Sequence, residues 1–214
     1  MCGGASIRAT GRALVLIIGV TGPIAAGKSA VDGMLRDLGA DPVVDGDAVV
    51  HGLYRTSAPL QEALAAAFGP DVRGADGAID RGALGARVFG DPAALRRLED
   101  LVHPATRAEV RARLAAAEAA RPDSVAVVDA VKLLYGELAA LCTVRWWVHA
   151  GRDTQLRRLV KNRHMTRADA ERRLAAQPRL DDWRDRVDLV IDNSGPLADT
   201  RRQVEQAWRA LLDR

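Results

Sequence analysis

The sequence predicts an α/β protein with a doubly wound, five-stranded parallel sheet. Two observations carry this prediction. Five short apolar runs, rich in Val, are separated by helical patterns. The runs are continuously apolar rather than alternating, which is typical of strands covered by helices on both faces. We expect the strands at residues 14–20, 42–45, 124–129, 143–149 and 187–191 of a 214-residue chain.

The first strand leads directly into a phosphate-binding sequence. Residues 22–29 read GPIAAGKS, which fits G-x-x-x-x-G-K-[ST], and a helical apolar pattern follows. Backbone N–H groups of such a loop bind phosphate oxygens, helped by the positive end of the helix. Lys28 would reach the β- and γ-phosphates of a nucleotide, and the Ser29 hydroxyl would bind Mg²⁺. A chance glycine turn is the alternative, which the strand–loop–helix context disfavours.

Acidic residues follow the second and third strands. Asp45 and Asp47 come at the end of the second strand, and Asp129 ends the third. Ligands of such sheets bind at the carboxyl ends of the strands. Asp47 could accept the proton of an attacking hydroxyl, and Asp129 could hold Mg²⁺ through water. The alternative for each acid is a helix cap or a turn.

Residues 51–122 interrupt the strand–helix alternation. They predict helices only, too many for one crossover, so we expect an insertion over the active-site edge. Asp91 and Pro92 mark a helix start, with Asp as the N-cap and Pro at the first helical position. Pro104 should break or kink the long helical pattern that continues to residue 120.

Residues 152–182 form a second interruption, rich in arginine. The pattern predicts two short basic helices joined near His164, and Thr166 begins a helix-start box. Such a charge run can be a solvated helix face. Between the last two strands of this fold it can also be a lid, whose arginines stabilise a transferring phosphoryl group. Arg158 and Arg163 are the strongest candidates.

Composition limits the classes of partner. The net charge of +3 suits an anionic ligand, and no block of like charges predicts a nucleic-acid partner. Cys2 and Cys142 form no disulfide framework, which favours a reducing, cytoplasmic compartment. No segment has the length of a membrane span, and no obligate protein partner is evident. We expect a mobile leader at 1–12 and a core formed by 13–50, 123–151 and 183–214.

An ordered set of short motifs accompanies the phosphate loop. These are Gly19-Val20-Thr21-Gly22, Val44-Asp45-Gly46-Asp47, Asp80-Arg81, Val88-Phe89, Leu101-Val102-His103-Pro104, Gln155-Leu156-Arg157-Arg158-Leu159, Ala175-Ala176-Gln177 and the run from Val187 to Gly195. In this order they resemble the dephospho-coenzyme A kinases, a family of P-loop kinases. The resemblance covers nearly everything from residue 15 onward.

The resemblance implies ATP- and Mg²⁺-dependent phosphorylation of the ribose 3′-hydroxyl of dephospho-CoA, the last step of CoA synthesis. It implies that Asp47 is the base and that the insertion binds the acceptor through Arg81 and His103. Taken alone, Arg81 is an ordinary surface arginine after a cap, and His103 precedes a helix kink. It also implies that residues 152–182 are the lid, with Arg158 facing ATP. The residues expected to bind ATP are Gly22, Ala25, Ala26, Gly27, Lys28, Ser29, Ala30, Arg158 and Asn193.

The sequence departs from the family pattern in several places, among them Ala30 after the loop Ser and Asn162 at the lid's second Arg position. Pro23, Ala25 and Ala26 replace the family's glycines and Ser, and their Cβ atoms restrict positive φ, so we expect the loop to use backbone angles that they tolerate. Val-Lys-Leu-Leu-Tyr at 131–135 replaces Pro-Leu-Leu-Phe-Glu and introduces Lys132 as a candidate contact to an acceptor phosphate. Another small-molecule kinase, such as a nucleoside monophosphate kinase, and a nucleotide-binding switch without an acceptor remain alternatives.

Overall fold

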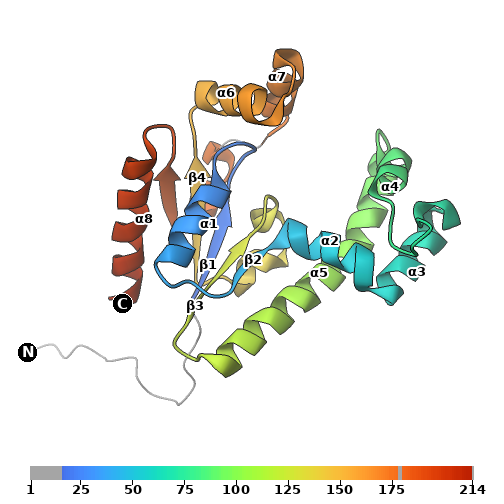
Figure 1. Ribbon diagram of the computed structural model, residues 1–214, viewed down its shortest axis with the longest axis horizontal. Helices are drawn as coiled ribbons and strands as arrows, with labels where there is room; N and C mark the ends of the chain where they lie inside the picture. Colours follow the sequence, from blue (N-terminus) through green and yellow to red (C-terminus); the bar gives the residue numbers. More distant parts are fainter. Residues whose placement is uncertain (1–15, 178–179, 214) are drawn as a thin grey trace, which may run out of the picture.

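The computed structural model describes residues 16–177 and 180–213 (Figure 1), so the leader expected at 1–12 lies outside the described residues. The predicted fold class is confirmed. Five parallel strands form one sheet in the order β2-β3-β1-β4-β5. Their ends lie within two residues of the expected positions, and residues 14 and 15 of the expected first strand lie outside the described residues. The strands are β1 (Leu16–Thr21), β2 (Val43–Asp45), β3 (Val125–Asp129), β4 (Val144–His149) and β5 (Leu189–Asp192).

Helices cover both faces of this sheet. Ile18 and Val20 of β1 pack with α1 and α8, whereas Ala126 and Val128 of β3 pack against Val110 of α5 on the opposite face. Among the described helices, none is both long and apolar enough to cross a membrane. The helices are α1 (Lys28–Asp37), α2 (Gly46–Thr56), α3 (Ala58–Phe68), α4 (Arg81–Val88), α5 (Pro92–Ala120), α6 (Arg152–Arg163), α7 (Arg167–Ala175) and α8 (Leu197–Leu212), with 3₁₀ turns at Pro70–Val72, Leu133–Tyr135, Glu137–Leu141, Leu180–Asp182 and Arg184–Arg186.

The parallel register gathers the strand ends at one edge. Val20 of β1 lies opposite Asp129 of β3, and Asp129 lies opposite Asp45 of β2. The phosphate loop begins directly after β1, and Asp47 lies two residues after β2 ends. Local sequence and sheet register together therefore bring the loop and the three acids to the same edge of the sheet.

The helices α2, α3, α4 and the first half of α5 form an arm beside the core (Figure 1), with apolar side chains such as Leu64 and Leu84 at its centre. The expectation of helices alone in residues 51–122 is wrong at one point. Arg73 and Ile79 form an antiparallel bridge around a turn that contains Gly77. Helix α2 begins at Gly46, so the expected boundary at residue 51 falls inside a helix.

Helix α5 joins the arm to the core. Asp91 is its N-cap and accepts hydrogen bonds from two backbone N–H groups, as the sequence predicts. The helix continues through Pro104 to Ala120, and it changes direction between its two halves in Figure 1. Pro104 removes a helical hydrogen bond and crowds the preceding turn, which bends a helix. The proline therefore kinks the helix without ending it.

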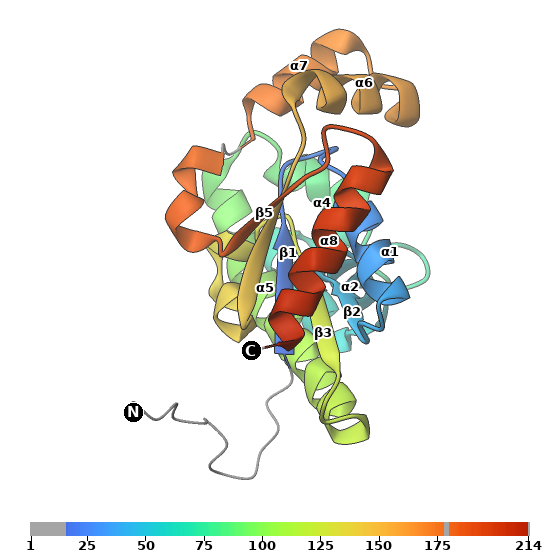
Figure 2. The same ribbon diagram turned by 90° about the vertical axis from the view of Figure 1, so that its left-hand side faces the viewer.

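The helices α6 and α7 lie above the carboxyl edge of the sheet (Figure 2). His164 ends α6 in the left-handed conformation with φ 51°, and the Thr166 hydroxyl accepts the Asp169 N–H that begins α7. Leu159 of α6 packs with Ile24 and Ala25 of the phosphate loop. The two predicted basic helices are confirmed, and they rest on the loop.

Candidate active site

Two glycines of the phosphate loop are required by its backbone. Gly22 has φ 150°, and a Cβ there would lie 2.3 Å from the Val148 carbonyl oxygen. Gly27 has φ 99°, and a Cβ there would lie 2.0 Å from Asn193 Nδ2. Ala25 corrects our expectation about the loop, because it adopts φ 59°, the left-handed region that alanine disfavours by about 1–2 kcal/mol. The surroundings of the loop must therefore hold it in place.

Arg158 supplies part of that support from α6. Its Nη1 donates to the carbonyls of Ala25 (3.1 Å) and Ala26 (2.9 Å), and its Nη2 donates to the Asn193 carbonyl (2.9 Å). Asn193 is 1% exposed, and its Nδ2 donates to the Ala26 carbonyl at 2.7 Å. These bonds engage the loop carbonyls, and the N–H groups of Lys28 and Ser29, which precede the first intrahelical bonds of α1, are the ones suited to an anion.

Two glutamines complete the support. Gln155 Nε2 donates to the Ile24 carbonyl at 2.8 Å, and Gln177 Oε1 accepts the Ile24 N–H at 3.2 Å. Sequence reasoning quoted both glutamines inside family motifs and gave neither a role. Their contacts with Ile24 could not be predicted from the sequence, because the two glutamines lie at opposite ends of the α6–α7 segment.

A cavity of about 170 Å³ opens between this loop and α6, and three cations converge on it. Arg158 and Arg163 both line it, although they lie five residues apart on α6. Of the other residues expected to bind ATP, Ala26 is buried and Ala30 donates its N–H to the Gly27 carbonyl. The lining residues are Ala25, Gly27, Lys28, Ser29, Arg158, Asn162 and Arg163.

A neighbouring cleft of about 370 Å³ continues from the phosphate cavity between α6 and the loop after β5. Ser194 and Gly195 line it, whereas the Asn193 side chain faces the phosphate loop and Thr200. In this structure Asn193 supports the loop, and its contact with ATP stays a prediction. The α6 residues that line the cleft are Thr154, Arg157, Arg158, Lys161 and Asn162.

Asp47 lies in a second cavity of about 370 Å³ on the other side of the strand ends. The two acids after β2 have different roles. The carboxylate of Asp45 accepts the Ala48 N–H at 3.0 Å and caps α2, whereas Asp47 is exposed to the cavity. The cavity is lined by Gly46, Asp47, Val50, His103, Thr106, Arg107, Ala130, Val131, Lys132, Tyr135, Gly136, Glu137 and Leu138.

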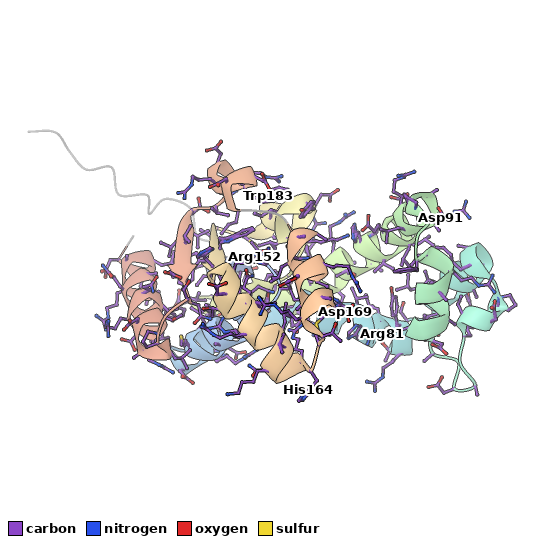
Figure 3. The ribbon with its side chains drawn as sticks, turned by 90° about the horizontal axis from the view of Figure 1, so that it is seen from above. Arg81, Asp91, Arg152, His164, Asp169 and Trp183 are labelled. Atoms are coloured by element: carbon purple, nitrogen blue, oxygen red, sulfur yellow. The ribbon has the colours of Figure 1, made fainter. Side chains whose placement is uncertain are left out.

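Two of the three predicted acceptor contacts join Asp47 in this cavity. His103 reaches it from α5, and Lys132 reaches it from the loop after β3, where its ammonium group is paired with Glu99. Arg81 does not line it. It begins α4 on the helical arm, where Figure 3 labels it. Burial raises the pKa of Tyr54, and the positive charge of Arg81 partly opposes that rise.

Beneath the loop lies a buried carboxyl pair. Asp129 is 8% exposed and Asp32 of α1 is 4% exposed. Burial raises the pKa of Asp129 to about 8 and also raises the pKa of Asp32, while the positive charge of Lys28 lowers both. The two carboxyl groups interact with each other, and one buried oxygen of each has no hydrogen-bond partner. Asp32 went unnoticed because its role depends on a distant strand.

Comparison with known proteins decides the family. The family model described as dephospho-CoA kinase matches residues 16–199. The chain belongs to the dephospho-CoA kinase family. A dephospho-CoA kinase of Symbiobacterium thermophilum is 46% identical, over 91% of this chain and 80% of the relative. A dephospho-CoA kinase of Geobacter metallireducens is 42% identical, over 94% and 98%. The crystal structure of TT1252 from Thermus thermophilus is 31% identical, with a TM-score of 0.75 over 93% and 97%.

For this dephospho-CoA kinase family member, Arg158→Lys tests the support of the loop. Lysine keeps the positive charge but lacks the planar fork that reaches three carbonyls. We expect kcat/KM for ATP to fall by about tenfold, since each lost charge-assisted bond contributes about 1.5–3 kcal/mol before compensation. Steady-state kinetics with varied ATP measure this effect. Arg167→Lys on the exposed side of α7 is the control, and equal kcat/KM values for both variants would contradict the prediction.

The carboxyl pair predicts a dependence of stability on pH in the protein free of nucleotide and metal. Asp129 binds a proton in the folded state up to about pH 8, whereas an unfolded Asp releases it near pH 4. The folded state therefore binds more protons, so the free energy of unfolding falls as pH rises between these values. Asp129→Asn should be more stable than wild type at pH 8 by about 1–3 kcal/mol. Denaturant titrations of both proteins at pH 5 and pH 8 measure the free energy of unfolding. An equal change in that free energy between the two pH values for wild type and Asp129→Asn would contradict the prediction.

Proposed function

We propose that this protein transfers the γ-phosphoryl group of ATP to the ribose 3′-hydroxyl of dephospho-CoA, giving CoA and ADP. One observation carries the proposal: a phosphate cavity around Lys28 and a second cavity around Asp47 open at the same edge of the sheet. The first suits the phosphates of a nucleoside triphosphate and the second suits an acceptor alcohol. The names of the relatives support this choice of substrates.

The chain's own residues fill the roles that phosphoryl transfer needs. Lys28 and the N–H groups at the start of α1 hold the β- and γ-phosphates, and Arg163 adds positive charge from α6. Asp47 accepts or orients the proton of the 3′-hydroxyl, because it is an exposed carboxylate at the end of β2, whereas Glu137, the other acid that lines the cavity, is paired with Arg107. The helices α6 and α7 act as a lid that limits water at the phosphates.

The residues near the loop fit a bound Mg²⁺. Ser29 lines the phosphate cavity, and Asp129 has a buried oxygen without a hydrogen-bond partner close to Lys28. These are hard oxygen donors, and Mg²⁺ usually takes few protein ligands and keeps waters and substrate phosphates. When bound, the ion would neutralise charge on the β- and γ-phosphates. The cysteine usage supports a cytoplasmic location for this reaction.

The arm formed by α2 to α5 supplies the acceptor side. His103 and Lys132 line the cavity beside Asp47, within reach of the sugar and phosphates of an acceptor. Arg81 lies outside this cavity in the described structure, at the start of α4. Its contact with the acceptor is proposed for a bound form in which the arm approaches the core.

A coupled ADP-release assay with dephospho-CoA, AMP, CMP and adenosine tests the proposal. We expect kcat/KM for dephospho-CoA to exceed the others by about a hundredfold, since the cavity binds the part of the acceptor beyond the nucleoside. The proposal also requires that CoA is detected among the products of the reaction with dephospho-CoA. A preference for AMP would make the protein a nucleoside monophosphate kinase, and slow ATP hydrolysis with no phosphorylated acceptor would make it a switch.

A further inference from the structure

Three charged or titratable side chains form a row along α5 at the acceptor cavity. Glu99, His103 and Arg107 follow each other at intervals of four residues, so they share one face of the helix. Two residues of the loop after β3 oppose the ends of this row. Glu99 is paired with Lys132, and Arg107 Nε lies 3.2 Å from a carboxylate oxygen of Glu137. The two ion pairs therefore join the same two segments with opposite polarity, and His103 lies between them in the row.

Arg107 has the features of a ligand-binding cation. Its side chain lines the cavity that also contains Asp47, and it is 24% exposed. The Nε contact to Glu137 is the only ion pair that Arg107 makes in the described part of the chain, so most of its planar fork is open to a further acceptor of hydrogen bonds. Guanidinium forks match the oxygens of phosphate groups closely.

Glu137 is a weak partner for that cation. Its side chain is 65% exposed, and exposed ion pairs contribute little because water and salt screen them. A phosphate group entering the cavity would carry more charge than one carboxylate and would accept two hydrogen bonds at once. When such a group displaces the Glu137 side chain from Arg107, the Glu137 carboxylate becomes fully solvated by water.

We propose that Arg107 binds the 5′-diphosphate of the acceptor and that Glu137 occupies Arg107 until the acceptor displaces it. This inference rests on the proposed function, since dephospho-CoA carries a diphosphate on the same ribose whose 3′-hydroxyl is phosphorylated. Lys132 is the second cation beside this diphosphate, and it exchanges Glu99 for the ligand in the same way. Without both cations, the acidic side chains Asp47 and Glu137 would repel an anionic acceptor.

Isothermal titration of dephospho-CoA into four proteins tests this exchange. Arg107→Gln should weaken binding at least about tenfold, because a charge-assisted pair is lost. Glu137→Gln should strengthen binding about two- to fivefold, since the competing carboxylate is removed. Arg113→Gln should leave it unchanged, because Arg113 pairs with Glu109 elsewhere on α5. Adenosine, which lacks the diphosphate, should bind wild type and Arg107→Gln with equal affinity.

The sign of the Glu137→Gln effect separates a binding role from a structural one. If the pair only held α5 to the loop, Arg107→Gln and Glu137→Gln would weaken dephospho-CoA binding together, and that result overturns the proposal. Equal affinities of Arg107→Gln and Arg113→Gln overturn it as well. Arg107→Lys, which keeps the charge, should bind with intermediate affinity and serves if the glutamine variant does not fold. If these predictions fail but the wild-type protein phosphorylates dephospho-CoA, the role of Arg107 is wrong and the proposed function still holds.

Discussion

Replacement of Lys28 by alanine should lower kcat for dephospho-CoA phosphorylation by about a thousandfold or more. Lys28 is the lysine of the phosphate cavity, where Arg158 and Arg163 are the other cations. The guanidinium group of Arg158 donates hydrogen bonds to loop carbonyls. It therefore cannot replace the Lys28 ammonium group at the β- and γ-phosphates without losing those bonds. Charge that develops on the transferring group would then lack its fixed partner.

The measurement is ADP release with saturating ATP and dephospho-CoA, together with thermal unfolding of each protein. Thermal unfolding is needed because Lys28 also lowers the pKa values of the buried pair Asp32 and Asp129. Arg209→Ala on the exposed side of α8 removes a positive charge far from the loop and should keep the full rate. A Lys28→Ala protein that is folded and retains a normal rate would remove the phosphate loop from the mechanism.

Asp47→Asn should lower kcat by about a hundred- to ten-thousandfold, the usual contribution of a positioned general base, with little change in KM for ATP. Asparagine keeps the shape of the side chain and removes its ability to accept a proton. Asp47 lies in the acceptor cavity and not in the phosphate cavity, so ATP should bind as before. The acceptor should also still bind.

Asp45→Asn is the matched control for this substitution. Asp45 lies two residues earlier and caps α2, a role that asparagine performs about equally well. Single-turnover measurements with ATP and dephospho-CoA would separate the chemical step from product release. An Asp47→Asn rate equal to that of Asp45→Asn would move the base to another residue of the cavity, with His103 as the next candidate.

The sequence predicted those features that depend on local patterns. The apolar runs set the five strands, Asp91 and Thr166 mark true helix starts, and the loop motif lies where the strand before it ends. Parallel strands then require Asp45 and Asp129 to meet at one edge. The separate roles of Asp45 and Asp47 could not be predicted, because either acid can cap a helix that begins beside both.

Features that depend on contacts between distant segments escaped prediction. Asp32 looks like a polar position of α1 until β3 brings Asp129 beneath it. Arg107 looks like a surface arginine until the loop after β3 opposes α5. The left-handed backbone of Ala25 was missed for the same reason, since the hydrogen bonds that hold the loop come from Arg158 and Asn193, far away in the sequence.

The contacts that α6 and the segment after α7 make with the phosphate loop constrain both protein engineering and evolution. A phosphate loop with glycine at its positive-φ positions adopts its conformation without strain. The helices that cover such a loop could be exchanged between relatives without loss of the loop conformation. Here Gln155, Arg158 and Gln177 dictate the path of an alanine-containing loop. A chimera that imports α6 and α7 from another enzyme must import these three contacts as well. The two segments are therefore expected to change in concert.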